Sequence, residues 1–174
     1  MAGHVALVLD TTYILPAFGV DVNVSPSFED EMATLWEDGI PDHDIYLPAV
    51  CIIEACYKVI KEYKHSSDER ILDRYTSALP PFLGSSPVTI VHPYLDVAAS
   101  DIAMKLRHAG HEDMMDCWIA GCAASYHAIL VTEDDVLKEK LKNLPATREI
   151  VCQTWVELQR SIQLPTDSEN DSVM

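Results

Sequence analysis

The chain has 174 residues, 48% of them hydrophobic, and a formal net charge of −16. This length and composition fit one globular domain with a sizeable core and exclude a largely disordered chain. No apolar stretch is long enough to span a bilayer, and the start lacks the basic segment of a secretory signal. We therefore expect a cytoplasmic protein with no membrane partner, and the acidity disfavours non-specific binding of nucleic acid.

Five cysteines form an odd count, and none of them makes a Cys-x-x-Cys pair. Structural zinc sites and disulfide frameworks use closer or paired spacings. We therefore expect reduced, buried thiols at all five positions, which are Cys51, Cys56, Cys117, Cys122 and Cys152.

A short aliphatic run, Val5–Leu9, opens the chain and stops at Asp10. Such a run predicts a strand that is buried on both faces. Residues 16–26 are expected to form a loop. A pattern similar to a capping box then begins a short helix at Ser27, and Gly39 ends that helix.

A stronger helix follows a turn at residues 38–44. Pro48 stands near its first turn, and the helix is expected to run from Ala49 to about Lys64. Glu54 lies next to the apolar stripe of this helix, whereas a solvated glutamate would be expected farther from the stripe. The stripe recurs at the spacing of a helix face packed on a core and consists of Val50, Ile53, Tyr57 and Ile60.

The second half of the chain alternates between helices and strands. The predicted helices are one capped by residues 66–69, running to about Leu79 and ended by Pro80 and Pro81, then 96–108, 114–127, 136–144 and 154–162, the last capped by Thr154. The predicted strands are 88–92, 128–132 and 149–152. Strands separated by helices predict an α/β fold, a three-layer α/β/α sandwich with a central, mostly parallel sheet. We expect one domain over residues 1–164 and an acidic, disordered tail over 165–174.

Four carboxylates from distant parts of the chain are expected at one edge of this sheet. Asp10 and Asp134 follow strands, and the ends of parallel strands meet at the same edge. Asp116 opens an apolar helix, where the helix dipole favours a carboxylate. Glu54 lies one turn into its helix, on the inward side.

A cluster of ionised carboxylates requires a cation, because like charges in contact raise one another's pKa. Ligands that are all oxygen select Mg²⁺ or Mn²⁺ over zinc. One or two such ions can activate water and clamp the oxygens of a phosphodiester during in-line displacement. The lack of a Gly-rich phosphate loop argues against an NTPase.

Four segments in this order resemble the motifs of the PIN-domain family, which are α/β/α metal-dependent ribonucleases that include VapC-type toxins. The resemblance extends from Val5 to about Leu158, nearly the whole chain. The segments are Val8–Leu15, Leu47–Glu54, Asp116–Ala123 and Ile129–Asp134.

The resemblance implies a role for each acid. Asp10 and Asp116 would be the most direct metal ligands, and Glu54 and Asp134 would complete the catalytic set, directly or through water. Supporting positions next to these ligands are implied for Thr12, Thr132 and Asp113.

The implied activity is that of an endoribonuclease, a hydrolase that leaves a 5′-phosphate and a 3′-hydroxyl. Its partners would be an RNA substrate, an antitoxin or other protein if the chain is a toxin, and a second copy in a homodimer. The alternative is a PIN-like scaffold that binds RNA or a protein without cleavage.

Two further sets of residues stay open at this level. His108 and His111 flank Gly110 and could reach the acids, although solvated loop histidines are the favoured interpretation. Two basic clusters could guide a phosphate backbone, and the alternative for both is an ordinary solvated helix face. The clusters are Lys58, Lys61 and Lys64, and Lys138, Lys140 and Lys142.

Overall fold

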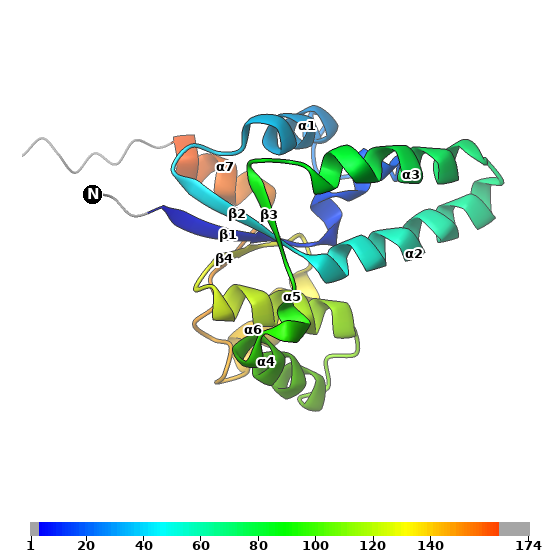
Figure 1. The fold of residues 1–174 in the computed structure, drawn as a ribbon. Coiled ribbons are helices and arrows are strands. Elements are labelled where there is room, and N and C mark those ends of the chain that lie inside the picture. Colours follow the sequence, from blue (N-terminus) through cyan, green and yellow to red (C-terminus); the bar gives the residue numbers. More distant parts are fainter. Residues whose placement is uncertain (1–3, 164–174) are drawn as a thin grey trace, which may run out of the picture.

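The structure is a computed structural model that describes residues 4–163. Five parallel strands form one sheet in the order β3-β2-β1-β4-β5 (Figure 1). The predicted α/β fold with a parallel sheet is confirmed, whereas the tail expected from residue 165 lies outside the described residues. The strands are β1 (Val5–Leu9), β2 (His43–Pro48), β3 (Val88–Val91), β4 (Ile129–Val131) and β5 (Cys152–Gln153).

Helices cover both faces of the sheet. Helices α1, α3 and α7 lie on one side, and α4, α5 and α6 on the other, while α2 and α3 extend together beyond the sheet edge (Figure 1). Short 3₁₀ turns follow β1 and β3. The helices are α1 (Phe28–Asp38), α2 (Ala49–Ser66), α3 (Arg70–Leu83), α4 (Val97–His108), α5 (Met114–Ser125), α6 (Asp135–Asn143) and α7 (Trp155–Gln163).

Strand β1 is the centre of the fold, as its apolar run predicted. Leu7, Val8 and Leu9 are completely buried, and the strand pairs with β2 on one side and β4 on the other. A central parallel strand is covered by helices on both faces, so an uninterrupted apolar run fits that place. Asp10 is therefore held by the most enclosed strand in the sheet.

Strand β2 was not predicted, because its residues were assigned to a turn and to the start of a helix. It aligns with β1 so that Ile45 lies opposite Leu7. Its buried residues alternate with less buried ones, and it begins with the polar pair His43 and Asp44. A strand with a polar start and alternating burial has only a short apolar pattern in its sequence.

Helix α3 continues through Pro80 and Pro81, which were predicted to end it. Both prolines lie in its last turn, and the carbonyl groups that they leave without an amide partner belong to Thr76 and Ser77, which are exposed. Phe82 holds this turn in place, since its ring lies 4.2 Å from the Trp36 ring and 5.5 Å from that of Phe18.

The buried side of α2 differs from the apolar stripe predicted for it. Val50 is buried as expected, but Ile53, Tyr57 and Ile60 are 46%, 66% and 38% exposed. The residues that accompany Val50 into the core are smaller: Cys51, Ala55 and Val59. The stripe prediction was wrong because the apolar pattern of α2 covers more of the helix than the part that packs.

Two helix starts test the capping predictions. At α7 the Thr154 hydroxyl accepts from the Glu157 N–H at 3.2 Å, and Glu157 accepts from the Thr154 N–H at 2.7 Å, so the predicted cap is confirmed. At α1 the Ser27 hydroxyl instead donates to the Glu31 carboxylate at 2.6 Å, and no side-chain cap forms. The capping box expected there was wrong.

Candidate functional site

Asp10 lies where β1 meets the end of β4. Its N–H donates to the Val131 carbonyl at 3.2 Å, and its carboxylate accepts from the Thr12 N–H at 2.7 Å. This contact caps the 3₁₀ turn Thr11–Tyr13, into which the chain bends as soon as the strand ends. Asp10 is only 7% exposed.

Burial raises the pKa of Asp10 to about 7, which is the largest effect on this carboxyl group. Hydrogen bonds from Thr132 and Thr12 oppose that shift, and the nearby charge of Asp116 adds to it. Asp10 forms no ion pair with any of residues 4–163. It is thus a buried acid without a counter-ion.

Asp116 lies in the first turn of α5 and is partly buried. Its Oδ2 atom lies 3.0 Å from Nε2 of His111. Burial raises the pKa of Asp116 to about 6, the hydrogen bond from His111 lowers it, and the charges of Asp113 and Glu54 raise it. The charge of Asp116 thus raises the pKa of Asp10, and the charge of Glu54 raises the pKa of Asp116.

His111 is a residue for which the sequence left two interpretations open, contact with the acids or a solvated loop position, with the second favoured. The solvated position favoured for it was wrong, because His111 is 6% exposed and its Nε2 atom contacts the Asp116 carboxylate. Arg107 donates to its carbonyl at 3.1 Å, and Gly110, with φ of 90°, turns the chain just before it. His108 on the other side of the glycine is exposed. The sequence signals are the place of His111 beside Gly110 and its short spacing from Asp116.

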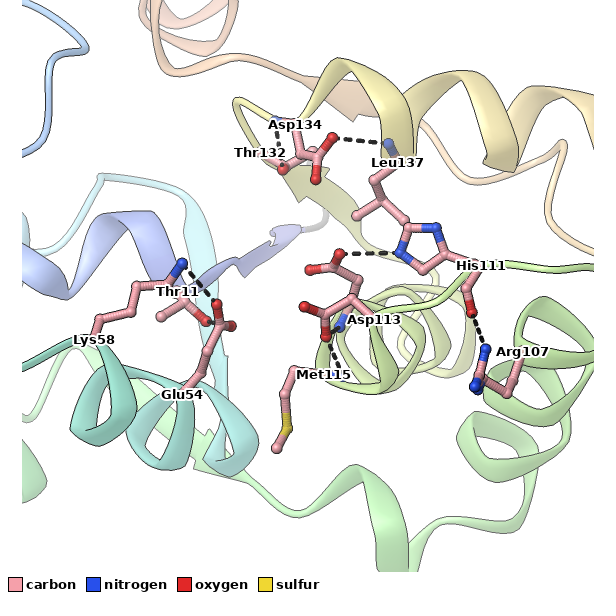
Figure 2. Close-up of polar contacts among 11 residues, drawn as sticks. Thr11, Glu54, Lys58, Arg107, His111, Asp113, Met115, Thr132, Asp134 and Leu137 are labelled. Atoms are coloured by element: carbon pink, nitrogen blue, oxygen red, sulfur yellow. Dashed lines mark hydrogen bonds and ion pairs between the residues drawn. The ribbon is translucent and has the colours of Figure 1, made fainter. Parts of the chain in front are cut away.

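Glu54 is held by two partners. The Thr11 hydroxyl donates to one of its oxygens, and Nζ of Lys58 lies 3.1 Å from the other (Figure 2). Thr11 is buried and links the turn after β1 to α2. The sequence singled out Thr12, whereas Thr11 makes the bond to Glu54. The only hint of this role in the sequence is that Thr11 directly follows Asp10.

Asp113 and Asp134 are both helix caps. Asp113 accepts from the Met115 N–H at 2.8 Å, and Asp134 accepts from the Leu137 N–H at 2.9 Å (Figure 2). Thr132 is fully buried and accepts from the Asp134 N–H at 3.1 Å, so it links Asp134 to the pocket of Asp10. Capping uses one oxygen of each carboxylate and leaves the other free for a ligand.

The donor set fits a divalent cation. Within residues 4–163, no three His, Cys, Asp or Glu side chains are already gathered at the spacing of metal ligands. Asp10 nevertheless combines deep burial, a strongly raised pKa and no ion pair, and the acids beside it contribute only oxygen atoms. A hard cation bound there would relieve the burial cost of these charges, and the oxygen donors favour Mg²⁺ or Mn²⁺.

The structure is thus an α/β domain with a parallel sheet, and acids from separate elements lie at the carboxyl edge of that sheet. The PIN domain model matches residues 7–142. The chain belongs to the PIN domain family, whose members are typically metal-dependent nucleases.

Two solved structures resemble the chain. One is a chain of VapBC2 from Rickettsia felis bound to a DNA fragment from their promoter, with 18% identity, a TM-score of 0.55, and coverage of 86% of this chain and 98% of that one. The other is a chain of FitAB bound to an IR36 DNA fragment, with 20% identity, a TM-score of 0.49, and coverage of 85% and 94%. The first supports the fold.

No curated protein sequence matches the chain. A search of residues 4–163 for a helix long and apolar enough to cross a membrane finds none.

Proposed function

We propose that the chain is a Mg²⁺- or Mn²⁺-dependent endoribonuclease whose catalytic domain corresponds to residues 1–164. The observation that carries this proposal is Asp10, a buried carboxylate at the end of the central strand with a raised pKa and no ion pair among residues 4–163. Membership of the PIN domain family supports the reaction class.

Asp10 and Asp116 would hold the metal most directly, and Glu54 and Asp134 would complete its surroundings. When bound, the cation would supply an activated water and neutralise the negative charge of the phosphate that is attacked. Thr11 fixes the direction of Glu54, and Thr12 and Thr132 bind the carboxylate of Asp10. Such bonds keep acidic ligands aimed at one point.

His111 and Lys58 would have supporting roles. His111 orients Asp116 through its Nε2 contact, and Lys58 offers an ammonium group beside Glu54 at the rim of the site. Lys58 is half-exposed, so it can contact a phosphate that approaches from solvent.

A toxin role within a toxin–antitoxin pair is the proposed setting, in which a protein partner would control the site. It is supported by likeness in fold to a chain of VapBC2, a complex solved with promoter DNA. A second copy of the chain is also a proposed partner.

A scaffold without cleavage activity is the competing function, and a specific observation favours it. His111 and Lys58 already lie beside two of the acids, so these charges are partly balanced without a metal. A scaffold of this kind would bind RNA or protein and leave RNA intact.

Cleavage of mixed structured and unstructured RNA with Mn²⁺ or Mg²⁺ tests the proposal, comparing the wild type with Asp10→Asn and Asp116→Asn. Asp21→Asn is the matched control, because Asp21 is an exposed loop acid. Metal-dependent cleavage that both site variants lose and the control keeps would support the nuclease. Metal-induced thermal stabilisation without cleavage by the wild type would favour the scaffold.

A further inference from the structure

A row of exposed cations on α2 starts at the candidate site. Lys58 and Lys61 follow Glu54 at positions i+4 and i+7, so they share its side of the helix, and Lys64 continues the row on the adjacent turn. All three lysines are exposed. Because an α-helix rises about 1.5 Å per residue, this lysine row (Lys58, Lys61, Lys64) extends about 15 Å from Glu54.

The lysine row contrasts with the charge of the chain. The sequence has 12 Lys and Arg against 28 Asp and Glu. Lys58 contacts Glu54, whereas Lys61 and Lys64 form no ion pair with any other residue between positions 4 and 163. The field of an acidic protein repels a polyanion over most of its surface, so a strip of unpaired cations is where one can approach.

Tyr57 adds an aromatic ring to the same face. It is 66% exposed and lies between the levels of Glu54 and Lys61 on the helix. A ring that stacks on a base, beside ammonium groups that contact phosphates, is the combination that binds single-stranded nucleic acid.

The face is open because α3 packs on another side of α2. Tyr75 of α3 donates to the carbonyl of Ile52, about 160° around the helix from Glu54. The two helices extend beyond the sheet (Figure 1), and Tyr57 and the lysine row on α2 are exposed.

We infer that Tyr57 and the lysine row bind single-stranded RNA and guide it to the acids, an inference that rests on the proposed function. Ile53 and Ile60 flank Tyr57 and could be covered by a second copy of the chain. The row favours RNA because it is continuous with Glu54, so one strand can contact the row and the site together.

Binding is measured first, by fluorescence anisotropy with a 5′-labelled oligouridylate of about 12 nucleotides, a length within the usual site sizes. EDTA prevents metal-dependent cleavage. Lys61→Gln/Lys64→Gln should raise the Kd about 25-fold at 0.1 M monovalent salt, because losing two phosphate contacts removes about 1.4 from the salt slope. The control Arg148→Gln/Arg160→Gln changes the net charge equally at exposed positions outside both lysine clusters and should leave the Kd unchanged.

Tyr57 is tested in the same assay. Tyr57→Ala should weaken binding about 5- to 150-fold, the usual effect of removing one stacking ring, and Tyr57→Phe should restore it. Because Tyr57 is exposed, neither change is expected to disturb the core, and circular dichroism checks folding.

Two results would overturn the inference directly: no RNA binding by the wild type, or equal losses of RNA affinity in the double variant and its control. A third would be variants of this face that lose a dimer in sedimentation but still bind RNA as the wild type does. The last would assign the face to a second copy. Cleavage of the mixed RNA with Mn²⁺ by the wild type, compared with Asp10→Asn, tests the acids separately. If it fails while the binding results hold, the nuclease proposal fails and RNA binding by this face stands.

Discussion

Replacing Asp10 with asparagine should stabilise the protein in the absence of metal. Asp10 is 7% exposed, and burial raises its pKa from 3.8 to about 7. The folded state therefore holds this proton more tightly than the unfolded state does. Asparagine has nearly the same shape, carries no charge, and keeps an oxygen that can accept from the Thr12 N–H.

The magnitude follows from the shift in pKa. Between pH 3.8 and about 7 the folded state binds more protons, so the free energy of unfolding falls as pH rises through this window and stays reduced above it. A shift of about three pKa units corresponds to about 4 kcal/mol. Asp10→Asn should therefore gain about 4 kcal/mol at pH 8 and about 2 kcal/mol at pH 5.5.

Urea unfolding followed by circular dichroism, at both pH values and with EDTA, measures this gain. Asp21→Asn controls for the loss of one negative charge and should change stability little. With Mn²⁺ the difference at pH 8 narrows to about 1 kcal/mol, because the wild type gains about 2.7 kcal/mol at 100 times its Kd and Asp10→Asn does not. Equal stability of Asp10→Asn and wild type at pH 8, or a difference independent of pH, would refute the burial argument.

Three further changes test other parts of the structure. His111→Ala should raise the pKa of Asp116 further above about 6, because the hydrogen bond from His111 lowers that pKa; carboxyl ¹³C NMR measures it, and an unchanged or lower pKa would contradict the contact. Gly121→Ala should destabilise the fold, because a Cβ there would lie 2.3 Å from the Ala99 carbonyl oxygen; thermal unfolding checks this, and wild-type stability would contradict the tight α4–α5 packing. Phe82→Ala should cost about 3–5 kcal/mol by opening a cavity beside Trp36 in a urea titration, and a loss under 1 kcal/mol would mean that the last turn of α3 is held by other contacts.

The sequence predicted those parts of the fold in which local pattern and burial agree. Strand β1 has a continuous apolar run because both its faces are covered, and its bounds were predicted correctly. Strand β2 was missed because its apolar residues alternate over too few positions. Helix α2 was placed correctly, but its packed side was not, since Tyr57 and Ile60 are apolar and yet exposed.

The candidate site was predictable as a set of positions but not as a set of contacts. Asp10 and Asp116 were singled out because strand ends and helix starts are visible in the pattern, and both have raised pKa values in the structure. Thr11 was not found, because its bond to Glu54 joins elements that are distant in sequence. His111 was favoured as a solvated residue, because the sequence does not show that this loop is buried against Asp116. The roles of all four residues at a metal site stay predictions.

The position of β1 has a consequence for synthesis of the protein. Strand β1 is synthesised before β4, yet Leu7 must pair with Ile129, a residue made much later. At a translation rate of about 5–20 residues per second, roughly 6 to 24 seconds separate the two. The pocket around Asp10 also needs Thr132 and Asp116, so it closes only after most of the chain has been made. A growing polypeptide therefore lacks a complete acidic centre until the segment with Thr132 has been synthesised and β4 has paired with β1.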